Sequence, residues 1–128
     1  MNSLKPDRLK TRADFLRAQR GVRKSTASLT LEVCQTPETA AKPGRFRMGF
    51  TASRKVGGAV ERNRAKRRLR EAARRLLPLS GRQCTDYVLV ARPATLTRPF
   101  EALLKDLAAA LVAAHVKLGN GERRDDTR

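Results

Sequence analysis

The alternation of apolar and polar residues predicts three strands in the middle of the chain. Over residues 28–36 and 45–53, apolar side chains alternate with polar ones, the period of a strand with one buried face. Residues 86–92 are almost all apolar, as in a central strand covered on both sides. Residues 37–44 contain two prolines and a glycine and are expected to form a loop. A loop of this length favours antiparallel pairing of the first two strands.

Helical spacing of apolar residues appears in two long segments and one short one. The long helices are expected over 60–77, which Pro78 should end, and over 98–118. The hydroxyl of Thr11 can cap a short helix that stops at Gly21. A short edge strand is expected directly after that glycine.

These elements predict a single α+β domain over residues 1–118, in which helices cover a sheet. Residues 119–128 are polar and are expected to form a disordered tail. The handedness rule for parallel strands would make the strand–helix–strand unit around 60–77 right-handed.

Charge narrows the choice of partner. The 128 residues carry 29 Lys and Arg against 12 Asp and Glu, a formal net charge of +17 that calls for a polyanion. Arginines outnumber lysines 21 to 8, and the planar guanidinium grips phosphate with two hydrogen bonds. No 18-residue apolar run and no secretory signal is visible. We therefore expect a cytoplasmic, nucleic-acid-binding protein with no membrane contact.

Much of this charge lies on the predicted helix 60–77. Eight of the fifteen residues from Glu61 to Arg75 are basic, and only Glu61 and Glu71 offset them. Like charges one turn apart destabilise a helix, so this arrangement suits an external anion. A solvated helix face would normally mix both signs. The basic residues are Arg62, Arg64, Lys66, Arg67, Arg68, Arg70, Arg74 and Arg75.

Two further features beside these cations suit RNA. Asn63 offers both a donor and an acceptor, which a sugar hydroxyl or a base edge can use. The preceding turn holds Arg54 and Lys55 and then two glycines, which let the backbone approach a ligand. A plain strand-to-helix connection would explain the glycines equally well, but not the two cations.

Residues suited to catalysis are scarce. The single histidine, His115, lies at the edge of an apolar helix stripe and is expected to be a packed or surface residue. Cys34 and Cys84 fall in or beside strands and are expected to be small core or edge residues. No nucleotide-binding glycine motif and no acidic cluster is present. The sequence thus indicates no catalytic residue, no metal ligand and no protein-bound cofactor.

Three stretches together resemble the protein component of bacterial ribonuclease P. Residues 47–55 read RMGFTASRK and continue into VGGAVERNRAKRRLRE over 56–71, which looks like the family's RNR signature in its full context. Residues 86–93, DYVLVARP, are similar to the family's last strand, and Asp14-Phe15 fits its first helix. The resemblance extends over about residues 4–118.

The resemblance implies a fold and a role. The fold would have the order α-β-β-β-α-β-α, a four-stranded sheet packed by helices, and a left-handed crossover in place of the right-handed one. The protein would be the accessory subunit of an endoribonuclease, binding a catalytic RNA and the 5′ leader of precursor tRNA. The RNA, with Mg²⁺, would perform the hydrolysis, and no DNA partner is implied.

The family's site residues carry over one by one. The signature implies that the catalytic RNA is contacted by Arg62, Asn63, Arg64, Lys66, Arg67 and Arg70. A leader cleft would be formed by Phe15, Arg54, Lys55 and Arg92. Two positions depart from the family pattern: Gln19 stands where a second aromatic is common, and Leu29 replaces another frequent aromatic.

Three other functions remain open at this level. A ribosomal-RNA-binding structural protein would also be small and rich in arginine. A DNA-binding regulator would place the basic helix in the major groove, but neither a zipper nor a helix-turn-helix partner is visible. A protein-only nuclease would need the acidic cluster that the sequence lacks.

Overall fold

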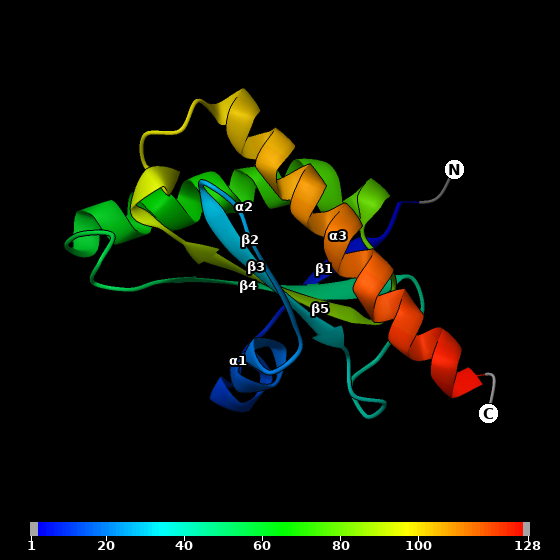
Figure 1. Cartoon of the computed structure of the whole chain (residues 1–128). Coiled ribbons are helices and arrows are strands. Elements are labelled where there is room, and N and C mark those ends of the chain that lie inside the picture. Colours follow the sequence, from blue (N-terminus) through cyan, green and yellow to red (C-terminus); the bar gives the residue numbers. More distant parts are fainter. Residues whose placement is uncertain (1–2, 127–128) are drawn as a thin grey trace.

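The computed structural model describes residues 3–126, with side chains from residue 3 to residue 119. The described strands form one five-stranded sheet. Figure 1 shows helices on both of its faces. In chain order the elements are β1 (Lys5–Arg8), α1 (Arg12–Gln19), β2 (Val22–Ser25), β3 (Leu29–Gln35), β4 (Arg45–Ala52), α2 (Ala59–Ser80), β5 (Thr85–Ala91), the 3-10 turn η1 (Pro93–Thr95) and α3 (Phe100–Asp126).

The sheet has the strand order β1-β4-β5-β3-β2, so it is mixed and five-stranded. The expectation of four strands is wrong because β1 adds an edge strand, parallel to β4. Its four residues include Pro6 and carry no alternating pattern, so periodicity could not find it. Edge strands tolerate proline because one side of their backbone needs no partner. The edge strand expected after Gly21 is confirmed as β2, which pairs antiparallel with β3.

Strands β3 and β4 are not neighbours, so the expected pairing between them is wrong. Strand β5 lies between them, antiparallel to β3 and parallel to β4. Its register places Leu89 beside Leu31 and beside Phe50. A nearly all-apolar strand gains most from a central position, and this outweighs the short connection between β3 and β4. The left-handed crossover implied for β4-α2-β5 stays a prediction.

Two layers of helix enclose the sheet. Helices α2 and α3 pack on one face, where Phe46, Leu69, Tyr87 and Leu107 are at most 1% exposed. Helix α1 lies on the other face, over β3 and β5, with its Ala18 packed in a smaller cluster (Figure 1). Each face therefore has its own apolar core, and the basic side of α2 is left outside both.

The helix ends differ in part from expectation. Thr11 caps α1 as expected, because its hydroxyl oxygen accepts the Asp14 amide hydrogen at 3.2 Å. Helix α2 runs to Ser80, so Pro78 does not end it at residue 77. The carbonyl of Pro78 instead accepts the Leu4 amide at 2.8 Å, which ties the N-terminal segment to the helix end.

The C-terminal helix also runs further than the sequence indicated. Helix α3 continues past residue 118 to Asp126, through most of the expected tail. Residues 127 and 128 of that tail lie outside the described residues, and the domain limit at 118 stays a prediction. Among the described residues, no helix is long and apolar enough to cross a membrane.

Candidate RNA interface

Helix α2 turns most of its predicted RNA contacts toward solvent. Asn63, Arg64, Arg67 and Arg70 are exposed, whereas Lys66 is half-buried. The helix can present these residues outward because its small and apolar residues sit on the sheet: Ala65, Leu69, Ala72, Ala73 and Leu77 are all fully buried. The sixth predicted contact, Arg62, is half-buried and donates to the Gly57 carbonyl at 3.2 Å, so it also holds the preceding turn.

Two arginines of the same helix serve the fold. The guanidinium of Arg68 lies 5.9 Å from the Phe100 ring centroid and donates to the Arg98 carbonyl. The guanidinium of Arg75 lies 4.9 Å from the same ring and pairs with Glu71 at 3.2 Å. These two cations therefore connect α2 to Phe100 at the start of α3. Helical periodicity places them on the flank opposite Lys66, where α3 packs.

A groove opens between α1, the outer edge of β4 and α2. Its cations come from β1 and α2, and its apolar lining comes from α1 and β4. The Phe15 ring packs directly on Gly49, because a Cβ atom at that glycine would lie 2.5 Å from the ring. The Arg70 guanidinium lies 5.3 Å from the Phe50 ring centroid. The lining residues are Arg8, Leu9, Phe15, Met48, Gly49, Phe50, Lys66, Arg70 and Arg74.

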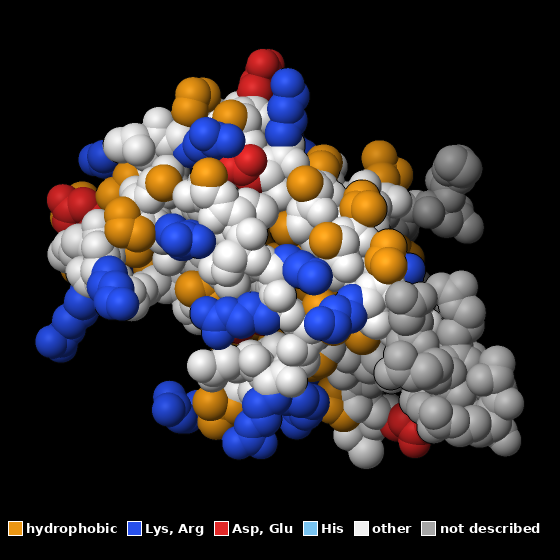
Figure 2. All heavy atoms as spheres, in the orientation of Figure 1, with side chains coloured by type: hydrophobic (Ala, Val, Ile, Leu, Met, Phe, Trp, Pro, Cys, Tyr) orange, Lys and Arg blue, Asp and Glu red, His pale blue; other side chains and the backbone are white. Residues whose placement is uncertain are grey.

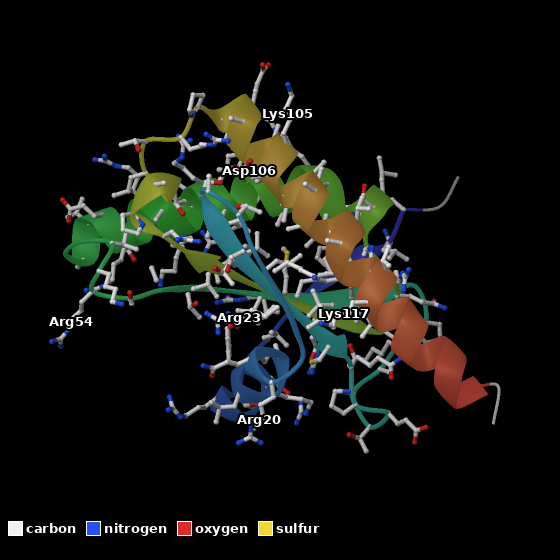
Figure 3. All side chains as sticks on the ribbon, in the orientation of Figure 1. Arg20, Arg23, Arg54, Lys105, Asp106 and Lys117 are labelled. Atoms are coloured by element: carbon white, nitrogen blue, oxygen red, sulfur yellow. The ribbon has the colours of Figure 1, made fainter. Side chains whose placement is uncertain are left out.

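The remaining residues of the predicted leader cleft lie elsewhere. Ala52 and Ala91 are paired at the carboxyl ends of the parallel strands β4 and β5. Arg54, Lys55 and Arg92 follow these ends and are all exposed. Figure 3 shows Arg54 pointing away from the body of the protein. The structure thus brings these three cations to one end of the sheet and places Phe15 in the groove beside α2.

A buried ionic network fixes α1 on the sheet. Arg47 donates to both carboxylate oxygens of Asp86, at 2.8 and 2.7 Å, and to Asp14 at 3.2 Å. Asp86 is fully buried and also accepts the Thr36 hydroxyl at 2.7 Å. Burial alone would raise the pKa of Asp14, but hydrogen bonds from Arg17 and Thr11 and the charge of Arg47 lower it. The network joins β4, β5 and α1, and so places Phe15.

Several acidic residues are engaged by basic neighbours inside the fold. Asp7 accepts two hydrogen bonds from Arg45, each at 2.7 Å, and this pairing lowers the pKa of Asp7. Asp106 accepts from Arg98 and from the Ser28 hydroxyl, the latter at 2.6 Å. The paired carboxylates leave the outer surface dominated by cations. Figure 2 shows Lys and Arg side chains gathered over α1 and around the turn after β4.

The remaining candidates for chemistry are structural. His115 is half-buried, and its Nε2 atom lies 2.7 Å from the Tyr87 hydroxyl, which accepts the Arg82 amide at 2.8 Å. Burial lowers the pKa of His115, and the nearby charge of Arg82 adds to this. Cys34 is buried and Cys84 half-buried, both as free thiols. Within the described residues, no three His, Cys, Asp or Glu side chains form a group that could hold a metal ion.

Comparison with known proteins identifies the chain's relatives. The family model described as Ribonuclease P matches residues 4–115. The chain belongs to the ribonuclease P protein family. The ribonuclease P protein component of Ruegeria pomeroyi is 50% identical over 108 residues, covering 84% of this chain and 85% of the relative. That of Caulobacter vibrioides is 45% identical over 120 residues, covering 94% and 78%.

Solved ribonuclease P proteins share the fold. The protein from Staphylococcus aureus superposes with a TM-score of 0.66 at 27% identity, covering 84% of this chain and 94% of that one. The protein from Thermotoga maritima gives 0.64 at 25% identity, covering 82% and 94%. The chain is thus a ribonuclease P protein component, a subunit in the processing of tRNA 5′ ends. These relatives favour this role over that of a ribosomal structural protein, and the family implies an RNA partner.

The ribonuclease P resemblance did not point to every residue of the interface. Arg8, Phe50 and Arg74 line the groove together with Lys66 and Arg70. Helical periodicity does indicate Arg74, which lies one turn after Arg70 and is one of the eight basic residues of the predicted helix. Arg8 could not be found from the sequence, because it reaches the groove only through the parallel pairing of β1 with β4.

Proposed function

We propose that this protein binds the catalytic RNA of ribonuclease P through the exposed side of α2. The observation that carries the proposal is the arrangement of Arg67 and Arg70 outward on a helix whose opposite side is fully buried. The surface that meets this RNA consists of the six predicted contacts Arg62, Asn63, Arg64, Lys66, Arg67 and Arg70. Its five cations bind phosphates, and Asn63 binds a sugar hydroxyl or a base edge. Arginine suits this task because its fork binds two phosphate oxygens at once.

A second surface holds the 5′ leader of precursor tRNA. Arg54, Lys55 and Arg92 follow the carboxyl ends of β4 and β5, and Phe15 packs on Gly49 further back along β4. Phe15 and Val90 are both partly buried against the small apolar cluster on the sheet face that α1 covers. An extended strand can cross this face with its phosphates on the cations and a base against the Phe15 ring.

In this scheme the RNA subunit and its Mg²⁺ perform the hydrolysis in the cytoplasm, and the protein is the accessory subunit. Its residues place the substrate and reduce repulsion between the phosphates of the two RNAs. The protein should therefore lower the Mg²⁺ concentration needed for cleavage. DNA and membranes are not expected partners.

Cleavage of precursor tRNA by the catalytic RNA at limiting Mg²⁺, with and without the full chain, tests the proposal. Stimulation is expected, and a lack of it would contradict the proposed role. The Arg67→Gln/Arg70→Gln double variant should weaken binding of the catalytic RNA. The matched control is Lys105→Gln, which removes an exposed charge from α3 and should bind like wild type.

Salt titration gives the electrostatic part of binding. If the five cations of this surface each neutralise one phosphate, the logarithm of affinity should fall with the logarithm of salt concentration with a slope of about −3.5. Removal of two cations in the double variant should bring the slope to about −2. A slope near zero for the wild-type protein would contradict phosphate binding.

The leader surface has its own test. Arg54→Gln should weaken binding of precursor tRNA to the assembled enzyme while binding of mature tRNA, which lacks the leader, stays unchanged. Equal losses for both RNAs would place Arg54 outside the leader surface.

A further inference from the structure

The groove between α1, β4 and α2 has the charge of a site for a phosphate-bearing ligand. Its volume of about 450 Å³ lies within the range of small-ligand sites. Four cations line it, Arg8, Lys66, Arg70 and Arg74, and no acidic residue does. A neighbouring hollow next to α1 also has four cations in its lining, but Asp7 and Asp14 offset two of those charges. The lining of the groove therefore carries the higher net positive charge of the two.

The groove also offers a surface for a base. Phe50 is half-buried on β4, and the Arg70 guanidinium lies 5.3 Å from its ring centroid. Phe15 forms the wall on the α1 side. Aromatic rings and guanidinium planes are the surfaces on which unpaired RNA bases stack. A base inside a duplex is already stacked on both sides, so the groove selects an unpaired nucleotide.

The backbone at this edge can add hydrogen bonds. Strand β1 ends at Arg8, opposite Met48, and the Leu9 amide donates to the Met48 carbonyl at 3.0 Å. Beyond that point the outer edge of β4, over residues 50–52, has no strand beside it among the described residues. Unpaired donors and acceptors on a strand edge can pair with another polar group. Phe50 belongs to this open stretch of β4, so these backbone groups adjoin the residue on which the base would stack.

The neighbouring elements indicate which RNA supplies the nucleotide. Lys66 and Arg70 belong to the α2 surface assigned to the catalytic RNA. Of the leader surface only Phe15 lines the groove, at its α1 wall, whereas the leader cations Arg54, Lys55 and Arg92 do not. We propose that the groove binds one unpaired nucleotide of the catalytic RNA, with its base on Phe50 and its flanking phosphates between Arg8 and the cations of α2. This inference rests on the proposed function, because it takes the catalytic RNA as partner.

The test compares four variants of the full chain in binding to the catalytic RNA. Phe50→Leu keeps an apolar side chain but removes the stacking surface, and it should lower affinity about tenfold. Phe50→Tyr keeps the ring and should bind like wild type. Arg8→Gln/Arg74→Gln removes two exposed groove cations, and Lys105→Gln removes a charge outside the groove. Chemical probing of the RNA bases should show one unpaired nucleotide protected by wild type and by Phe50→Tyr, but not by Phe50→Leu.

The outcomes separate the inference from the function on which it rests. Wild-type affinity and protection in both Phe50→Leu and Arg8→Gln/Arg74→Gln would overturn the groove assignment while leaving the function intact. If those variants lose affinity for precursor tRNA alone, the groove serves the leader and the assignment to the catalytic RNA is wrong. If wild type itself fails to bind the catalytic RNA, the proposed function has failed. If thermal unfolding shows that Phe50→Leu does not fold, the Arg8→Gln/Arg74→Gln variant tests the groove assignment instead, because both of its residues are exposed.

Discussion

Replacement of Arg47 by methionine should destabilise the fold more than loss of any exposed arginine. The side chain of Asp86 is 0% exposed, and that of its partner Arg47 is 15% exposed. Arg47→Met leaves this buried carboxylate with the Thr36 hydroxyl and no cation. Breaking a buried pair by removing one partner costs about 3–5 kcal/mol. That is a large share of the roughly 5–15 kcal/mol that stabilises a typical domain.

Urea unfolding followed by circular dichroism measures this loss. With a slope of about 2 kcal/mol per molar urea, a loss of about 4 kcal/mol moves the midpoint down by about 2 M. Arg74→Met is the control, because Arg74 and its partner Glu71 are 64% and 43% exposed, and such pairs contribute about 0–1 kcal/mol. Arg47→Met/Asp86→Asn should recover part of the loss by removing the isolated charge. An Arg47→Met midpoint equal to that of Arg74→Met would refute this reasoning.

Two further predictions concern stability. Gly21→Ala should destabilise the fold by about 1–3 kcal/mol, because the added Cβ atom would lie 2.2 Å from the Val33 carbonyl oxygen. The control is Gly58→Ala, whose added Cβ atom meets only the flexible Glu61 side chain. Equal melting temperatures of the two variants would refute the predicted clash. Burial lowers the pKa of His115 below the 6.5 of the unfolded chain, so its contribution to stability is complete above about pH 6.5 and declines as the pH falls toward the folded value. The test measures the free energy of unfolding of wild type and of His115→Gln from pH 8 to pH 5. Only wild type should show this decline, and parallel curves of free energy against pH for the two proteins would contradict it.

Sequence patterns located most elements because their signals are local. Helix α2 and strand β5 have apolar residues at helical or continuous spacing, and each was expected within a few residues of its place. The cap on α1 was predictable too, since Thr11 and Asp14 are three positions apart. Strand pairing was not, because the position of β5 between β3 and β4 depends on contacts far apart in the chain.

The roles of the arginines divide in the same way. The RNR signature predicts which residues contact RNA, and this stays a prediction, although Arg67 and Arg70 are exposed as it requires. The signature also left out Arg68, but it did not predict that this side chain packs on Phe100. Nor did it predict that Arg47 neutralises a buried aspartate. Only burial and partners in the folded structure define these two roles.

The sequence by itself determined that this protein needs an anionic partner, that one helix carries much of the charge and that the family is that of ribonuclease P. Its composition and its motif are properties of neighbouring residues, so they need no fold to be seen. Only the tertiary structure decided that Phe15 shares a groove with Arg8 from β1 and Arg70 from α2, and that Arg54 and Arg92 meet at the other end of β4 and β5. Such groupings come from the sheet order, which places distant segments side by side to bury apolar surface.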